Sequence, residues 1–407
     1  MISPRSAVQV IKEHSSTLPL RQVSIDDALG NVLAEDVTSP MDFPRFDNSA
    51  MDGYAVRAKD TVGGVPDRPV RLSLTETVYA GDRRNAALAA GTACGIMTGA
   101  PVPRGADAII PVEQAIIDGN ELVVEVPPHR GRHIRHQGEE IKRGARVLRS
   151  GSPIHPGTIA CLAALGKSRV RVVPMPRVSI IATGNETVSP GHPLRRGEIY
   201  DSNTHMLKAM LKQMGIEAAR VRRVRDHPTA LANAVTAALH VSDVLVVVGG
   251  VSMGEKDYLR PVLKRLRVRE RFWRVAQKPG KPLYFGTRGR RLVFGLPGNP
   301  ASAFTCFYVY VYPALRRLAG VRHPGLNTAR APIEASSQSD PHKWRFLKAT
   351  SSRSGVVSIL PHQGSHMITS LQRTNSLVVL PPEANKQAGD LAETYSLPYS
   401  EDVHDID

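Results

Sequence analysis

Three acidic residues follow apolar runs of this chain, and their chemistry suits a cation. Glu186, Asp226 and Asp257 each stand just beyond such a run, of which Val244 to Val248 is the most apolar. Three carboxylates gathered at one place would repel one another without a cation. Mg²⁺ prefers oxygen ligands and is usually shared between a few carboxylates and substrate phosphates. The pattern predicts a magnesium site; the alternative is that one or two of these acids only cap helices.

Glycine-rich turns follow the same apolar runs and favour an anionic ligand. Gly249 and Gly250 end the run Val244 to Val248, and glycine lets the backbone approach a ligand closely. Backbone N–H groups at such turns and at helix starts bind anions, and Lys278 and Lys281 add positive charge. The other candidate residues are Thr183, Gly184, Ser202, Ser252, Pro297, Gly298, Asn299 and Pro300. We expect a phosphorylated ligand here, although an isolated Gly-Gly pair would fit an ordinary strand-to-helix turn.

The elements that position these residues alternate between strands and helices from residue 176 to residue 322. The continuous β-branched residues of Val244 to Val248, without polar alternation, are typical of a parallel strand covered on both faces. Alternating strands and helices predict a doubly wound α/β domain, whose ligands bind beyond the carboxyl ends of the strands. We therefore expect the candidate residues to meet at one edge of this sheet.

The remainder of the chain predicts three further parts. Residues 46–133 show short strands between turns, such as Val70 to Val78, which indicates a β-rich domain. Residues 323–407 show a separate small β-domain, with strands expected at Trp344 to Ala349, Val356 to Leu360 and Ser376 to Leu380. Residues 1–45 and 134–175 form a scaffold, in which Ser24 is expected to begin a helix over residues 25–29. The loop from Phe46 to Ala55 holds two acids and an amide, so it is either part of a polar site or a simple turn.

Composition and charge limit the class of protein. The net charge of +16 favours polyanions, but it is spread along the chain, and the alternating arginines of residues 265–271 suit the solvated face of an edge strand. The three cysteines show neither disulfide nor zinc spacing. The apolar stretch from Ala301 to Leu315 is shorter than a membrane span and predicts a buried helix. We expect a cytoplasmic protein that binds neither nucleic acid nor a membrane.

These residues together resemble the molybdopterin molybdenumtransferase family, MoeA, whose animal relative is the E domain of gephyrin. The resemblance covers nearly the whole chain. Its motifs are Phe46 to Ala55, Thr98 to Asp107, Thr183 to Glu186, Gly249 to Tyr258, Lys278 to Pro282, Pro297 to Ser302 and Gln363 to His366. It implies a MogA-like molybdopterin-binding α/β domain with a β-rich insertion, an elongated N-terminal scaffold and a C-terminal β-barrel-like domain. It also implies insertion of molybdenum from molybdate into adenylylated molybdopterin, with Mg²⁺ and release of AMP.

The resemblance also implies roles for individual residues and for a second subunit. Family members look like homodimers whose active cleft lies between the α/β domain of one subunit and the β-rich domain of the other. Asp52 matches an acid contributed across the dimer, Thr98 a hydroxyl of the same domain, and Ser365 a serine of the C-terminal domain. The matching catalytic and metal-binding carboxylates are Glu186, Asp226 and Asp257, and the ligand-facing residues include Lys278, Lys281, Pro297 and Pro300. Asn185 departs from the family, which usually has an acid there.

Other functions remain open at this point. The preceding step, adenylylation of molybdopterin, is carried out on a similar α/β domain, and the enzyme that performs it is a further possible partner. An interaction scaffold like the gephyrin E domain would not require intact Glu186, Asp226 and Asp257. A nucleic-acid binder is indicated by charge alone and would show a steep salt dependence.

Overall fold

The computed structural model of the 407-residue chain describes residues 1–83, 87–251, 257–352 and 355–399. It divides into two compact units. The first unit comprises Met1–Glu35, Ser150–Ala160 and Ser168–Asp407, and the second comprises Asp36–Arg149 and Cys161–Lys167. The finer division into four domains predicted from the sequence stays a prediction. No helix in the described ranges combines the length and the apolar character that a membrane span requires.

The first unit contains a six-stranded sheet, ordered β17-β14-β18-β22-β21-β19, that carries the predicted α/β alternation. Strands β17, β14, β18 and β22 are parallel, whereas β21 runs antiparallel to both of its neighbours, β22 and β19, so the sheet is mixed rather than wholly parallel. The strands are β14 (Val178–Thr183), β17 (Ala218–Val224), β18 (Val244–Val248), β19 (Arg269–Trp273), β21 (Tyr284–Arg288) and β22 (Arg291–Leu296). The edge strand β19 confirms the interpretation of the alternating arginines for Arg269 and Arg271 only, because Arg265 ends α5 and Arg267 lies in the turn before β19.

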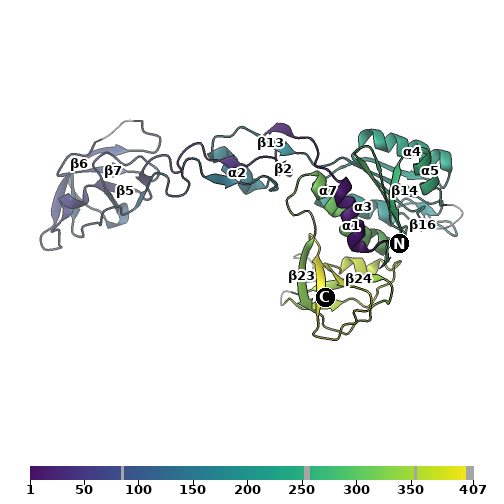
Figure 1. The fold of residues 1–407 in the computed structure, drawn as a ribbon. Helices are drawn as coiled ribbons and strands as arrows, with labels where there is room; N and C mark the ends of the chain where they lie inside the picture. Colours follow the sequence, from purple (N-terminus) through teal and green to yellow (C-terminus); the bar gives the residue numbers. More distant parts are fainter. Residues whose placement is uncertain (84–86, 252–256, 353–354, 400–407) are drawn as a thin grey trace. The chain divides into compact units, whose positions relative to one another are not determined.

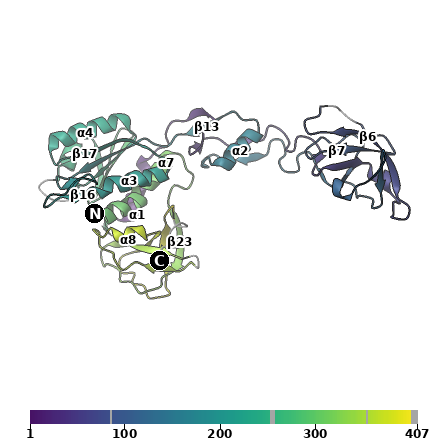
Figure 2. The same ribbon diagram turned by 180° about the vertical axis from the view of Figure 1, so that it is seen from behind.

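Both faces of this sheet are covered, which explains why its central strands are apolar throughout (Figures 1 and 2). Val244, Val246 and Val248 of β18 pack in the core that includes α3 (Ser202–Gln213). Leu245 and Val247 pack in the opposite core with α4 (Pro228–Val241) and α5 (Leu259–Arg265). A strand buried on both faces gains nothing from polar alternation, so the continuous apolar run has a structural cause.

A continuous helical segment begins at the carboxyl edge of the sheet. It consists of α6 (Pro300–Cys306), a π-helical stretch (Phe307–Val311) and α7 (Tyr312–Leu318). Every residue of the π-helical stretch is buried, which confirms the predicted buried helix. The switch to π geometry was not predicted.

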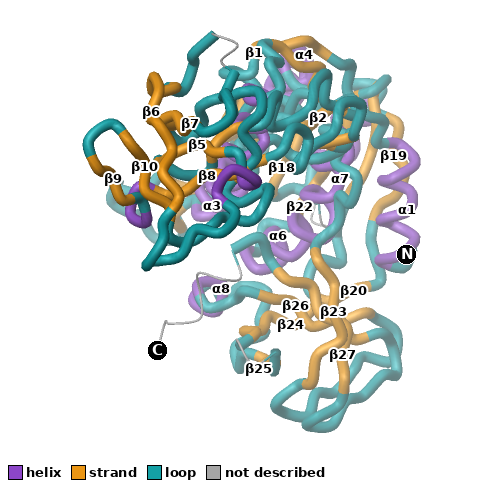
Figure 3. The backbone as a smooth tube through the Cα atoms, turned by 90° about the vertical axis from the view of Figure 1, so that its left-hand side faces the viewer, coloured by secondary structure: helices purple, strands orange, loops and turns teal. Residues whose placement is uncertain are grey.

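The C-terminal sheet of the first unit has the order β20-β24-β26-β27-β23, and β25 pairs with β24 (Figure 3). It contains the three strands predicted for this region, β24 (Trp344–Ser351), β25 (Val357–Ile359) and β26 (Ser376–Leu380). The other strands are β20 (Gln277–Lys278), β23 (Asn327–Pro332) and β27 (Leu391–Ser396), and α8 spans Thr369–Gln372. Because β20 lies between β19 and β21 along the chain and pairs with β24, this sheet is joined directly to the α/β domain.

The remaining elements of the first unit form the scaffold and a small insertion. They are α1 (Pro4–His14), a three-stranded sheet of β1 (Arg21–Ser24), β13 (Arg169–Val173) and β2 (Val32–Leu33), and the pair β15 (Thr187–Val188) and β16 (Ile199–Tyr200). Helix α2 (Pro156–Ala164) begins in this unit. The helix predicted over residues 25–29 is wrong: the Ser24 hydroxyl accepts a hydrogen bond from the nearby Asp26 N–H at 3.1 Å, which makes a turn instead of a helix cap.

The second unit is built on a six-stranded sheet of order β8-β5-β7-β6-β10-β9. Its strands are β5 (Gly53–Val56), β6 (Val70–Val78), β7 (Thr92–Ile96), β8 (Ala108–Pro111), β9 (Ile116–Asp118) and β10 (Glu121–Val124). Short 3₁₀ turns span Ala58–Thr61 and Val112–Gln114, and two further pairs join β4 (Asn48–Ser49) to β11 (Ile134–Arg135) and β3 (Val37–Thr38) to β12 (Arg146–Leu148). The β-rich prediction for this region agrees with these elements.

Candidate active site

A cavity of about 760 Å³ opens at the carboxyl edge of the α/β sheet. It is lined where β14, β18 and β22 end, because parallel strands deliver their following turns to the same edge. The predicted residues that line it are Thr183, Gly184, Glu186, Ser202, Asp226, Gly249, Gly250, Asp257, Pro297, Gly298, Asn299 and Pro300. The structure therefore brings together most of the residues singled out from the sequence.

The three predicted carboxylates all reach this cavity, from the turns after β14, β17 and β18. Asn185 and Asp226 are joined reciprocally: the Asn185 N–H donates to Asp226 Oδ2 at 3.2 Å, and the Asp226 N–H donates to Asn185 Oδ1 at 3.1 Å. This amide, at a position where an acid was expected, thus fixes the ends of two strands without adding a fourth charge. The other carboxylate oxygen of Asp226, Oδ1, takes no part in these two hydrogen bonds.

The carboxylates of the cavity fit an Mg²⁺ ion that is shared between protein and substrate, rather than one that protein ligands alone enclose. Within the described ranges, no group of three His, Cys, Asp or Glu side chains is close enough to hold an ion by itself. Mg²⁺ usually keeps several waters and binds one or two carboxylates together with substrate phosphates. Glu186, Asp226 and Asp257 around one cavity meet that requirement. The assignment of these three residues to a metal stays a prediction.

Two buried polar atoms of residues that line the cavity have no hydrogen-bond partner within the described part of the chain. They are Thr183 Oγ1 and Asn203 Oδ1. The Asn203 side-chain amide meanwhile donates to the carbonyl of Gly298 at 2.6 Å, which ties the start of α3 to the loop after β22. A buried polar atom without a partner costs free energy, so polar groups of a ligand at this edge would supply what the protein lacks.

Glycine is required where β14 and β18 end side by side. Gly249 has φ +89°, and a Cβ there would lie 2.6 Å from the Thr183 carbonyl oxygen. Gly250 has φ +65°, and its Cβ would lie 3.1 Å from Thr183 Oγ1. A close backbone approach at this turn is therefore present, but among the described residues the neighbour that requires it is the adjacent strand. The approach to a ligand stays a prediction.

Lys278, Lys281 and Ser365 adjoin the cavity without lining it. Lys278 and Lys281 are exposed, and Pro282, directly after them, is a lining residue. Ser365 accepts a hydrogen bond from the Asn299 side chain at 3.0 Å, and its carbonyl accepts from the Ala301 N–H at 3.2 Å. The C-terminal β-domain is thus joined to the ligand loop after β22. Ser252 lies outside the described residues.

Several lining residues were not predicted. Ile199 and Tyr200 of β16, His366 and Ile368 line the same cavity, and Ile199 is 56% exposed. The sequence feature that could have identified Ile199 and Tyr200 is that they form an apolar pair within the proline- and glycine-rich stretch between β14 and α3. Periodicity did not reveal it because β16 has only two residues.

Asp52 and Thr98 form a pair in the second unit. Asp52 Oδ1 accepts hydrogen bonds from both the N–H and the hydroxyl of Thr98, each at 2.7 Å. These two bonds, the backbone one first, lower the pKa of the Asp52 carboxyl. The pair forms because Gly53 of β5 lies opposite Ile96 of β7, so the residue before one strand meets the turn after the other. Asp52 is therefore held as an exposed carboxylate.

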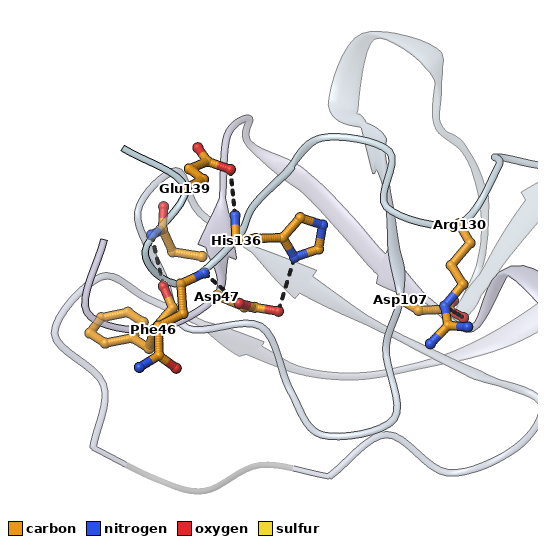
Figure 4. Close-up of polar contacts among 8 residues, drawn as sticks. Phe46, Asp47, Asp107, Arg130, His136 and Glu139 are labelled. Carbon is orange, nitrogen blue, oxygen red and sulfur yellow. Dashed lines mark hydrogen bonds and ion pairs between the residues drawn. The ribbon is translucent and has the colours of Figure 1, made fainter. Parts of the chain in front are cut away.

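The loop that precedes Asp52 is held by the segment from His136 to Glu139 (Figure 4). Asp47 accepts hydrogen bonds from the Gln137 N–H at 2.7 Å and from the His136 ring at 3.2 Å. Glu139 in turn accepts from the His136 N–H at 2.7 Å. Since these contacts fix the polar loop at its start, Asp47 has a structural role, whereas the Asp52 carboxylate is bound by Thr98.

Comparison with known protein families accounts for most of the chain. Residues 2–166 match the MoeA N-terminal region (domains I and II), residues 179–317 a probable molybdopterin binding domain, and residues 330–397 the MoeA C-terminal region (domain IV). These matches follow one another in the order that the motifs predicted.

Individual relatives agree with the family matches. Molybdopterin molybdenumtransferase 2 of Mycobacterium tuberculosis is 36% identical over 373 residues, covering 90% of this chain and 91% of the relative. Molybdopterin molybdenumtransferase of Staphylococcus aureus is 31% identical over 384 residues, covering 93% and 91%. The crystal structure of a molybdopterin biosynthesis MoeA protein from Pyrococcus horikoshii superposes with a TM-score of 0.80 at 31% identity, covering 98% of this chain and 99% of that one. The chain therefore belongs to the molybdopterin molybdenumtransferase family, MoeA, a family of enzymes of molybdenum cofactor biosynthesis.

Proposed function

We propose that this protein transfers molybdenum from molybdate to adenylylated molybdopterin, in an Mg²⁺-dependent reaction that releases AMP and molybdenum cofactor. The observation that carries the proposal is that Glu186, Asp226 and Asp257 line one cavity at the sheet edge together with glycine turns and the start of α3. Both substrates are anionic, so the cavity must accept negative charge beside its own carboxylates. A shared cation and the nearby Lys278 and Lys281 provide the compensating charge.

Each part of the cavity has a separate task in this proposal. Glu186, Asp226 and Asp257 would hold Mg²⁺ against the phosphate groups, where the ion supplies electrostatic stabilisation of the departing phosphate. Ser202 and Asn203 of the first turn of α3 contribute polar groups to the wall, and the Asp201 carboxylate caps this helix by accepting a hydrogen bond from the Thr204 N–H at 3.0 Å. Lys278 and Lys281 attract the oxyanions, and Ser365 orients the loop beside Asn299. The Thr183 hydroxyl, which has no hydrogen-bond partner among the described residues, is available to a polar group of the substrate.

We further propose that the working form is a homodimer in which Asp52 and Thr98 of one subunit complete the cavity of the other. The support is the exposed Asp52 carboxylate, held by Thr98 in a compact unit separate from the one that contains the cavity. An acid fixed by two short hydrogen bonds is positioned for ligand contact rather than for core packing. The upstream adenylyltransferase is the proposed supplier of substrate.

The direct test is incubation of the purified protein with adenylylated molybdopterin, molybdate and Mg²⁺, with AMP release followed by chromatography. We expect AMP only when all three are present, together with a product that activates a cofactor-free molybdoenzyme. A parallel reaction with molybdopterin and ATP tests the adenylylation alternative. Adenylylated product in that reaction, with no AMP release in the first, would overturn the proposal, and inactivity in both would favour the scaffold alternative.

A further inference from the structure

A buried polar network lies beneath the turn that carries the two lysines. Gln277 of β20 is 1% exposed, and its side-chain amide donates to the Pro279 carbonyl at 2.9 Å. The Gln277 carbonyl oxygen accepts a hydrogen bond from the Tyr310 hydroxyl, and its Nε2 contacts Cys306 Sγ at 3.6 Å. One glutamine side chain therefore connects the backbone of the exposed turn to the interior of the α/β domain.

The turn is packed tightly onto this network. Gly280 has φ +93°, and a Cβ there would lie 2.5 Å from Cys306 Sγ and 2.7 Å from Gln277 Nε2. The Cys306 thiol also lies 3.7 Å from the Gly280 carbonyl oxygen. Since the backbone between Lys278 and Lys281 rests directly on buried side chains, its position depends on them.

The network originates in the helical segment that also borders the cavity. Cys306 ends α6 and Tyr310 lies in the π-helical stretch, whereas Pro300 and Asn299 at the start of the segment line the cavity. Burial raises the pKa of both the Tyr310 hydroxyl and the Cys306 thiol, so both groups stay protonated and neutral. Single turns of π-helix are rare and occur frequently near functional sites. The cavity wall and the turn are thus attached to one rigid segment.

We infer that Tyr310 and Gln277 are positioning residues, which hold the turn so that Lys278 and Lys281 face an oxyanion of the substrate. Neither residue touches the substrate. When the backbone of the turn is already fixed, the lysines lose less conformational entropy on binding an anion. Binding is therefore tighter than it would be with a loose turn. The inference rests on the proposed function, since only that function assigns the lysines to an anionic group.

The first experiment compares Tyr310→Phe with a matched control, Tyr308→Phe. Tyr308 is also buried in the π-helical stretch, but its hydroxyl contacts Gln213 at 3.3 Å and not the turn. Each change removes one buried hydroxyl. We expect Tyr310→Phe to raise the KM for molybdate or for adenylylated molybdopterin about two- to tenfold, the range of one lost hydrogen bond, with kcat within twofold. Tyr308→Phe should leave both KM values within twofold, although its melting temperature falls by a similar amount.

A double-variant cycle tests whether the two positioning residues act as one unit. Gln277→Met keeps the length of the side chain but removes both of its hydrogen bonds. We expect the KM of the Gln277→Met, Tyr310→Phe protein to match that of Gln277→Met alone, because residues of one network are not additive. Unchanged KM values in both single variants, or fully additive increases, would overturn the inference.

A readout independent of activity separates this inference from the proposed function. Lys278 pairs with Arg345 of β24, so amide hydrogen exchange in a peptide covering residues 277–281 reports whether the turn stays in place. We expect faster exchange of this peptide in Tyr310→Phe than in Tyr308→Phe. Faster exchange with a wild type that releases no AMP would refute the proposed function alone. Equal exchange in the two variants would refute the positioning role, whether or not the wild type is active.

Discussion

The close approach of two strand ends at the cavity makes a sharp prediction about Gly249. In Gly249→Ala, the new Cβ would lie 2.6 Å from the Thr183 carbonyl oxygen at a φ of +89°. The left-handed conformation costs an L-residue about 1–2 kcal/mol, and overpacking against a fixed backbone adds about 1–3 kcal/mol. The expected loss of unfolding free energy is therefore about 2–5 kcal/mol, or about 4–20 °C in melting temperature for a unit of this size.

Gly298→Ala is the matched control, in the turn after β22 that lines the same cavity beside Gly249. Gly298 does not adopt the left-handed conformation, and a Cβ there would lie 3.8 Å from its nearest neighbour, the Cα of Gly249. Its melting temperature should stay within about 1 °C of wild type, since the methyl group meets no clash. Because Gly298 lines the cavity, AMP release should nevertheless be impaired.

Differential scanning calorimetry and the AMP-release assay on the same preparations decide this prediction. Equal melting temperatures for Gly249→Ala and wild type would refute the close approach of β14 and β18. A stable Gly298→Ala protein with unaltered kinetics would instead remove this wall of the cavity from substrate binding. The melting temperature of Gly249→Ala tests the packing of the strand ends, and the kinetics of Gly298→Ala test substrate binding. Either prediction can therefore fail without the other.

Three further predictions concern the acids. Asp257→Asn keeps the size of the side chain but removes its charge, so AMP release should collapse while the melting temperature changes by less than about 2 °C; a fully active variant would exclude Asp257 from the site. Mixed Asp52→Ala and Asp226→Ala subunits should regain about a quarter of wild-type activity after random exchange, since half of the dimers would have one intact cavity of two; no recovery despite demonstrated exchange would contradict sharing. The lowered pKa of Asp52 means that its favourable ionisation is lost as pH falls through the folded value, so Thr98→Val should move the acid limb of the activity profile to higher pH; an unmoved limb would show that Asp52 ionisation does not control activity.

Much of the α/β domain could be predicted because its signals are local. A strand buried on both faces must be apolar throughout, as in Val244–Val248, and the residues after parallel strands must meet at one edge. Glu186, Asp226 and Asp257 were found by this rule, without any knowledge of the partner strands. The long strand β6 was likewise predicted at its observed limits, Val70–Val78, because turns bound it on both sides.

Local signals were misleading where a competing contact decided the outcome. The residues near Ser24 have a plausible helix cap, but the Ser24 hydroxyl bonds two residues ahead and the chain pairs as β1 with β13. The direction of β21 was also beyond local reasoning. A tight turn at Gly289 and Arg290 joins β21 to β22, and such a short connection produces antiparallel neighbours.

The sequence by itself determined which residue types stand at the strand ends and in what order, since these depend on burial and turn chemistry along the chain. Only the tertiary structure decided which of them line the cavity and which act at a distance. It seats Ser365 against Asn299, places Lys278 and Lys281 just outside the lining, and sets Gln277 and Tyr310 beneath them. Such pairings join positions far apart in the chain through hydrogen bonds and packing, and no periodicity in a sequence records which distant side chain will be the partner.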